Sequence, residues 1–98
     1  MKEIRRSETF DKWLKKLRDG KARNRVLTRI RRLANGNPGD SRFLSGISEL
    51  RIDYGPGYRV YYIETGEEII ILLCGGDKTT QQEDIAKARE IAQIYNKE

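Results

Sequence analysis

The spacing of apolar residues changes twice along this 98-residue chain, and the change limits the folds that it can adopt. Between residues 8 and 34, apolar residues recur every three or four positions, which is the spacing of a buried helical stripe. From Ile47 they alternate with polar residues, as in a strand with one buried face, and after Thr80 the helical spacing returns. The pattern predicts an α+β fold in which helices pack against a sheet.

Two helices are expected before the sheet. Ser7 is a suitable N-cap for the first helix, which we expect Asp19-Gly20 to end. The second helix is predicted from Lys21 to Ala34, and Asn35-Gly36 provides its C-terminal stop. The apolar stripe of the first helix consists of Phe10, Trp13, Leu14 and Leu17.

Four segments predict strands. Lys2 to Arg6 fits a short edge strand with Ile4 facing the core. The segment from Ile47 to Tyr54 alternates, and its outward side chains are expected to be Glu49, Arg51 and Asp53. The last two strands are predicted at Tyr58 to Glu64 and Glu68 to Cys74, the second of which is apolar throughout and expected to be covered on both faces.

Thr80 and Glu83 fit a capping box for a C-terminal helix. The predicted order is therefore β-α-α-β-β-β-α, with an antiparallel meander sheet, two N-terminal helices and one C-terminal helix. At 98 residues, the chain is expected to form one domain, residues 1–98.

Composition excludes several functional classes. Twenty Lys and Arg against fifteen Asp and Glu give a net charge of +5, which favours polyanions or acidic proteins as partners. The chain has no histidine and a single cysteine, Cys74, so we expect no metal and no cofactor, and any catalysis must use Lys, Arg, Tyr or carboxylates. No apolar segment is long enough to span a membrane, and a cytoplasmic location is expected.

Arg51 and Arg59 are the first candidate site residues. If Leu50 pairs with Val60 on the buried face, the two arginines emerge together on the opposite face. Two neighbouring guanidinium groups can clamp a phosphate through several parallel hydrogen bonds. The alternative is that they form ordinary surface ion pairs with neighbouring carboxylates.

Lys78 and Tyr58 are also candidates. Lys78 follows Gly75-Gly76 at a strand end, where glycine allows close backbone approach and a helix N-terminus favours an anion. A lysine beside two arginines would have a lowered pKa and could transfer a proton, whereas the alternative is a loop lysine without a role. Tyr58, next to the Gly55-Pro56-Gly57 turn, could stack on a base or simply pack against the core.

The polar face of the second helix is strongly basic. It could contact RNA backbone or an acidic partner, or it could be an ordinary solvated helix face. Its arginines are Arg23, Arg25, Arg29, Arg31 and Arg32.

Together these motifs resemble the RelE/ParE toxin superfamily, in particular its HigB-like branch of addiction module killer proteins. The similarity covers Ile4 to about Ile91. The segments that carry it are Phe10–Leu14 (FDKWL), Gly46–Ile52 (GISELRI), Gly55–Tyr62 (GPGYRVYY) and Leu72–Lys78 (LLCGGDK).

The resemblance implies a toxin of a type II toxin–antitoxin module that its cognate antitoxin neutralises. RelE and HigB members cut messenger RNA on the ribosome without a metal, which makes Arg51, Arg59 and Lys78 catalytic candidates and Tyr58, Arg29 and Arg32 RNA-binding candidates. ParE members inhibit DNA gyrase instead, and a nucleic-acid-binding protein without toxicity is a third hypothesis. Catalytic RelE members often carry a tyrosine or histidine early in the last helix, where this chain has Thr80-Gln81-Gln82.

Overall fold

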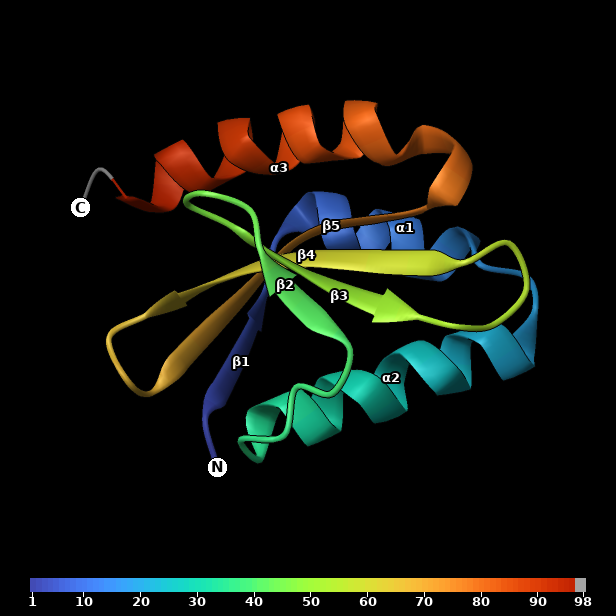
Figure 1. The fold of residues 1–98 in the computed structure, drawn as a ribbon, viewed down its shortest axis with the longest axis horizontal. Coiled ribbons are helices and arrows are strands. Elements are labelled where there is room, and N and C mark those ends of the chain that lie inside the picture. Colours follow the sequence, from blue (N-terminus) through green and yellow to red (C-terminus); the bar gives the residue numbers. More distant parts are fainter. Residues whose placement is uncertain (97–98) are drawn as a thin grey trace.

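The computed structural model describes residues 1–96, in which one five-stranded sheet lies between helices on its two faces (Figure 1). The α+β class and the three expected helices are confirmed, and a short 3-10 helix, η1, precedes the last one. In chain order the elements are β1 (Glu3–Arg6), α1 (Glu8–Lys16), α2 (Gly20–Ala34), β2 (Ser41–Phe43), β3 (Ser48–Ile52), β4 (Tyr58–Thr65), β5 (Ile69–Asp77), η1 (Lys78–Thr80) and α3 (Gln81–Asn96).

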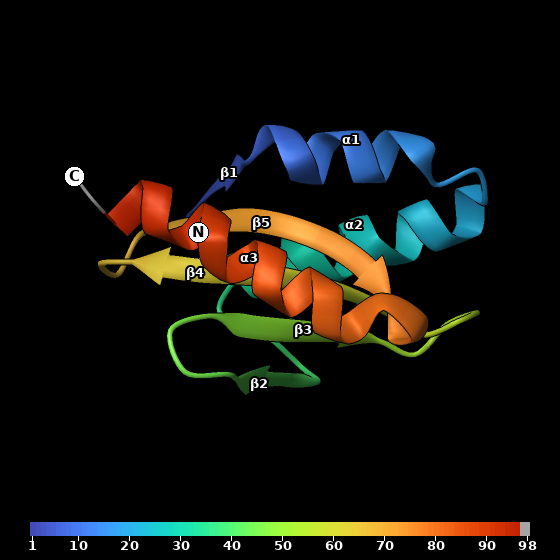
Figure 2. The same ribbon diagram turned by 90° about the horizontal axis from the view of Figure 1, so that it is seen from above.

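The sheet is mixed rather than purely antiparallel, which corrects the predicted meander. Its strand order is β1-β5-β4-β3-β2, and β1 pairs with β5 in parallel while β2 to β5 form the antiparallel meander (Figure 2). In the sequence, two helices lie between β1 and the next strand. No hairpin turn therefore forces β1 to run antiparallel to its neighbour in the sheet. The sequence interpretation also missed β2, whose three residues are too few to show a period.

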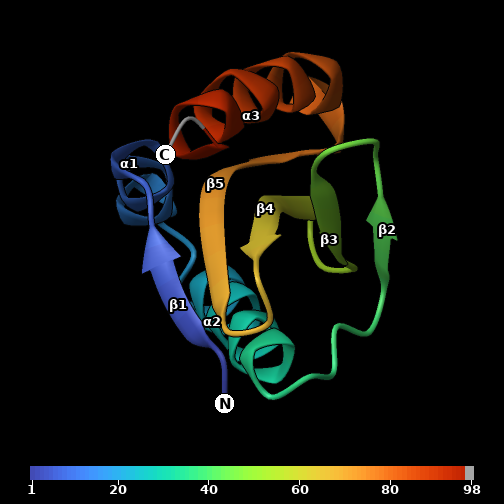
Figure 3. The ribbon, with the colours of Figure 1, turned by 90° about the vertical axis from the view of Figure 1, so that its left-hand side faces the viewer.

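Each face of the sheet has its own hydrophobic core. On one face, α1 and α2 pack on the strands through residues that include Phe10 and Val26, which are fully buried. On the other face, α3 contributes Ala88 and Ala92 (Figure 3). β5 is buried on both faces, as its unbroken apolar run predicted. Among residues 1–96, no helix is both long and apolar enough to cross a membrane.

The first helix ends earlier than predicted, because Asp19, which was expected to end it, caps the second helix instead. Ser7 caps α1 as expected, because its Oγ accepts a hydrogen bond from the Phe10 N–H at 3.0 Å. α1 ends earlier, at Lys16, and Asp19 instead caps α2 by accepting from the N–H groups of Lys21 and Ala22.

The predicted capping box of Thr80 and Glu83 is wrong. Asp77 is the N-cap, and its partner in the capping box is Thr80, which lies three residues later. The Asp77 carboxylate accepts hydrogen bonds from the Thr79 N–H and hydroxyl, and these lower the pKa of Asp77. The chain therefore turns one residue after β5 and passes through η1 into α3.

Candidate functional site

Arg51 and Arg59 lie side by side on the sheet. They are direct partners in the antiparallel pairing of β3 with β4, while Leu50 pairs with Val60 on the opposite, buried face. The alternation of β3 and β4 therefore predicted this juxtaposition correctly. Both arginines line a hollow of about 360 Å³, here called the site hollow, and so does Lys78. The residues that line it are Asp40, Arg51, Ile52, Asp53, Gly57, Arg59 and Lys78.

Arg51 is held at the rim of the site hollow by Asp40. Its Nη2 and Nε donate to the same carboxylate oxygen of Asp40, at 2.8 and 3.1 Å. The Arg51 side chain is 38% exposed, and an ion pair in such a position contributes at most about 1 kcal/mol to stability. An incoming phosphate can therefore compete with Asp40 for this guanidinium group.

Arg59 is far more enclosed, with only 13% of its side chain exposed. One guanidinium nitrogen, Nη1, donates to the carbonyl of Gly57 at 2.7 Å. Its Nε is buried, has no hydrogen-bond partner among the described residues, and lies 4.0 Å from a carboxylate oxygen of Glu49. Gly57 has φ +82°, and a Cβ there would come within 2.9 Å of the Arg59 Nη1, so the turn residue makes room for the guanidinium group.

Lys78 enters the site hollow from η1, directly after β5. It is exposed, and its Cβ is 3.6 Å from where a Cβ on Gly57 would lie. The sequence predicted that the helix N-terminus after β5 would accept a ligand anion. The Asp77 carboxylate caps that N-terminus at η1 instead, so it is not open to a ligand. Lys78 itself supplies the positive charge at this end of the hollow.

Gly75 and Gly76 serve packing, which corrects their interpretation as an approach for a ligand. A Cβ on Gly75 would lie 2.5 Å from two Trp13 ring atoms, Cδ2 and Cζ3. A Cβ on Gly76 would lie 2.6 Å from the Asp84 Cγ on the other side of the sheet. The glycine pair therefore lets α1 and α3 close onto the two faces of β5.

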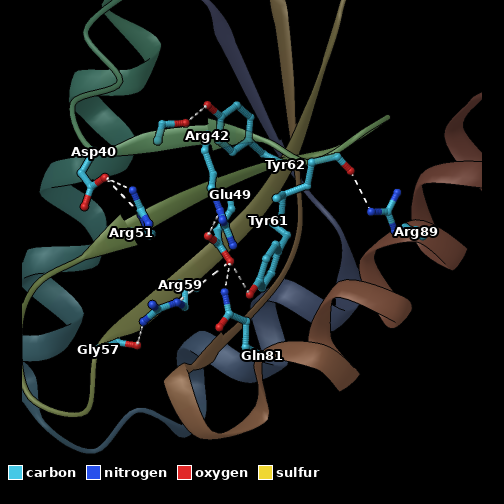
Figure 4. A network of polar contacts seen from close by, with 12 residues as sticks. Asp40, Arg42, Glu49, Arg51, Gly57, Arg59, Tyr61, Tyr62, Gln81 and Arg89 are labelled. Atoms are coloured by element: carbon cyan, nitrogen blue, oxygen red, sulfur yellow. Dashed lines mark hydrogen bonds and ion pairs between the residues drawn. The ribbon is translucent and has the colours of Figure 1, made fainter.

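Glu49 is the functional candidate that the sequence interpretation missed. It was expected to face solvent, yet it is fully buried. Its Oε1 accepts from the Arg42 Nε at 3.0 Å, and its Oε2 accepts from the Tyr61 hydroxyl at 3.0 Å and the Gln81 Nε2 at 2.8 Å (Figure 4). Burial, with the Glu49 carboxylate beside it, raises the pKa of Tyr61, which keeps the phenol protonated as a donor.

A sequence signal for this burial did exist. Ile47, Glu49 and Arg51 share one face of their strand segment by two-residue spacing, and Ile47 is apolar. An apolar residue on the supposedly solvent-facing side indicates that this end of the face is covered. α3 and the loop before β3 supply the cover, and Arg89 of α3 donates to the loop carbonyls of Leu44 and Ser45.

The tyrosines of β4, and Tyr54 in the turn before it, have mainly packing roles. Tyr61 and Tyr62 are buried, whereas Tyr54 and Tyr58 are partly exposed. The Tyr58 ring meets Trp13 edge to face, with centroids 6.2 Å apart. Tyr58 lies on β4 next to Arg59, but it is not one of the residues that line the site hollow.

A second, larger hollow of about 690 Å³ lies along α2 and is here called the α2 hollow. It meets the site hollow at Ile52 and Asp53, which line both. Arg32 is exposed in it, whereas Arg29 donates to the carbonyls of Arg51, Pro38 and Asp40 and so braces β3 and the preceding loop. The residues that line this hollow are Lys21, Asn24, Arg25, Thr28, Arg29, Arg32, Ile52 and Asp53.

Comparison of the sequence with known proteins gives a match to a family model and to a relative in Haemophilus influenzae. Residues 12–96 match the family described as "Phage derived protein Gp49-like (DUF891)". The chain is also 49% identical over 92 residues to an uncharacterized protein of Haemophilus influenzae, and the match covers 93% of each chain. The family match includes all the residues that line the two hollows.

Proposed function

Because the chain belongs to the Gp49-like family of phage-derived proteins, a RelE-like family of toxins in addiction modules, we propose that it is a toxin that cleaves messenger RNA on the ribosome. Within the wider RelE/ParE superfamily, its motifs favour the HigB-like branch. The observation that carries the proposal is the meeting of three cations, Arg51, Arg59 and Lys78, in one hollow. Cations gathered on a rigid sheet are suited to stabilising the charge that develops on a phosphate in reaction.

The chemistry proposed is metal-independent cleavage. The 2′-hydroxyl oxygen attacks the adjacent phosphorus, and the bond to the 5′-oxygen breaks to leave a 2′,3′-cyclic phosphate and a 5′-hydroxyl. Arg51 and Arg59 stabilise the negative charge on the phosphorane oxygens. Lys78 donates a proton to the departing 5′-oxygen, and Asp53, a carboxylate that lines the site hollow, accepts the proton of the 2′-hydroxyl.

The α2 hollow extends the proposed RNA path away from the cleaved phosphate. Arg32 contacts the RNA backbone there, and Arg29 acts through its three carbonyl bonds by fixing the strand that carries Arg51. Tyr58 remains a candidate for base stacking at the edge of the site.

Arg32→Ala is expected to weaken RNA binding without slowing the cleavage step, because contacts with phosphates away from the cleaved one supply affinity rather than chemistry. The slope of log Kd against log salt should fall by about 0.7, because one phosphate of the single-stranded RNA is no longer neutralised by an arginine. Arg31→Ala is the matched control, since Arg31 is exposed on the same helix but does not line the α2 hollow. Equal effects of the two substitutions on Kd would show that the hollow has no special role.

An acidic antitoxin segment is the proposed protein partner, bound over the two basic hollows. Its affinity should decrease as salt is raised from 0.1 M, where charges are screened over about 10 Å, to higher ionic strength. Titration calorimetry at several salt concentrations, with the product of the neighbouring gene as the antitoxin candidate, measures the change. A Kd that does not respond to salt would contradict an electrostatic interface.

A non-enzymatic inhibitor of DNA gyrase is the second candidate. One observation favours it: early in the last helix, where RelE members often carry a catalytic tyrosine or histidine, this chain has Thr80-Gln81-Gln82, and the Gln81 amide donates to buried Glu49. Expression in bacteria, followed by mapping of 5′ ends on cellular messenger RNA, tests the two functions. Codon-phased cuts support cleavage, and intact messages with trapped gyrase–DNA complexes support gyrase inhibition.

A further inference from the structure

Glu49 is the centre of a polar cluster that joins four elements. Its carboxylate receives hydrogen bonds from β2 through Arg42, from β4 through Tyr61 and from the first residue of α3, Gln81. Arg59 of β4 faces the same carboxylate at 4.0 Å (Figure 4). A fully buried carboxylate is costly unless it is paired and hydrogen-bonded, so this position needs a reason beyond packing.

Arg59 depends on this carboxylate for its position. Its Nε is buried without a hydrogen-bond partner among the described residues, and the hydrogen bond that holds its guanidinium group there runs from Nη1 to the Gly57 carbonyl. This one hydrogen bond fixes Nη1 but leaves Nε and Nη2 of the planar group without a hydrogen-bond partner among the described residues. The Glu49 carboxylate lies 4.0 Å from Nε and offers a second point of attachment, while Arg59 also lines the site hollow.

We propose that Glu49 is a positioning residue that fixes the Arg59 guanidinium group for its role in the site hollow. The catalytic consequence rests on the proposed function, whereas the positioning of Arg59 does not. A catalytic group that is displaced by even 1 Å loses much of its effect, so a positioning residue can control the rate without touching RNA.

Glu49→Gln is the direct test. A glutamine has one oxygen and one NH₂ group, whereas the site presents donors to both oxygens of Glu49, so one donor must face another. In either orientation of the amide, Arg59 also loses the negative charge behind Nε. We expect kcat to fall on the order of tenfold to a hundredfold with KM nearly unchanged.

A second readout follows Arg59 without any RNA. The Hε proton on its buried Nε, followed by NMR, should exchange slowly with water in the unmodified protein and clearly faster in Glu49→Gln. Tyr61→Phe is the matched control, because it removes one hydrogen bond from the same carboxylate and leaves the charge in place. Tyr61→Phe should lower the melting temperature yet preserve both kcat and slow exchange at Arg59. Should Glu49→Gln fail to fold, Glu49→Asp keeps the charge but withdraws it by one methylene, and it should also accelerate exchange.

The outcomes separate the two proposals. Slow Hε exchange and an unchanged kcat in Glu49→Gln would overturn the positioning role, as would equal effects of Tyr61→Phe. Fast exchange with an unchanged kcat would overturn its catalytic consequence. If Arg59→Ala itself cleaves RNA as fast as the unmodified protein, the proposed function of the site hollow fails, while the exchange rates still decide whether Glu49 positions Arg59.

Discussion

Alanine at Arg51, Arg59 or Lys78 is expected to slow cleavage of messenger RNA about a hundredfold at each position, because each removes one charge from a transition-state cluster. Binding of uncleaved RNA should change far less, so the loss should appear in kcat rather than in KM. Single-turnover cleavage of a ribosome-bound message measures it. Since the Arg51 pair with Asp40 is exposed, Arg51→Ala should leave the free energy of unfolding within about 1 kcal/mol.

Lys78→Arg distinguishes charge from proton transfer at the third position. Arginine keeps the positive charge but does not release its proton in a protein, so this variant should bind RNA normally and still cleave slowly. Lys16→Ala, at an exposed position on α1, is the control for a general loss of positive charge. If all three alanine variants stay toxic and still cleave RNA, the site hollow is not the active site; toxicity without cleavage would favour gyrase inhibition.

Most of the fold could be predicted from the sequence because apolar residues follow the helical period in α1 and α2, alternate with polar residues in β3, and form an unbroken run in β5. The pairing of Arg51 with Arg59 followed from the alternation in β3 and the short turn after it. The direction of β1 could not be predicted, because it depends on how two helices bring the chain back to the sheet. β2 was missed because its three residues, of which only Phe43 is large and apolar, are too few to show a period.

The candidate site was less predictable than the fold. Strand alternation identifies the face of a side chain, but it does not reveal whether another element covers that face. Glu49 shows the difference, because α3 covers it and turns an apparent surface carboxylate into a buried one. Arg29 shows it too. Its charge suggested RNA binding, but it donates to two carbonyls of a loop and to one carbonyl of β3, which only the folded chain brings near.

Gly75→Ala is expected to destabilise the fold strongly. The added methyl group would lie 2.5 Å from Trp13 ring atoms, and Trp13 is itself held edge to face against Tyr58. Overpacking of this kind costs about 1–3 kcal/mol, a large share of the roughly 5–15 kcal/mol that stabilises a domain. Thermal melting should show a decrease of about 4–24 °C, since each kcal/mol lowers the melting temperature of a domain of this size by about 4–8 °C.

Two further variants show whether the Trp13 ring is the cause. Gly20→Ala is the matched control, because its Cβ would meet nothing within 4 Å and it lies in a helix; it should leave stability unchanged or raise it by up to about 1 kcal/mol. In a Trp13→Leu background, Gly75→Ala should cost much less, because the smaller side chain leaves space for the methyl group. Independent, additive effects of the two substitutions would mean that Gly75 is required for a reason other than the approach of α1.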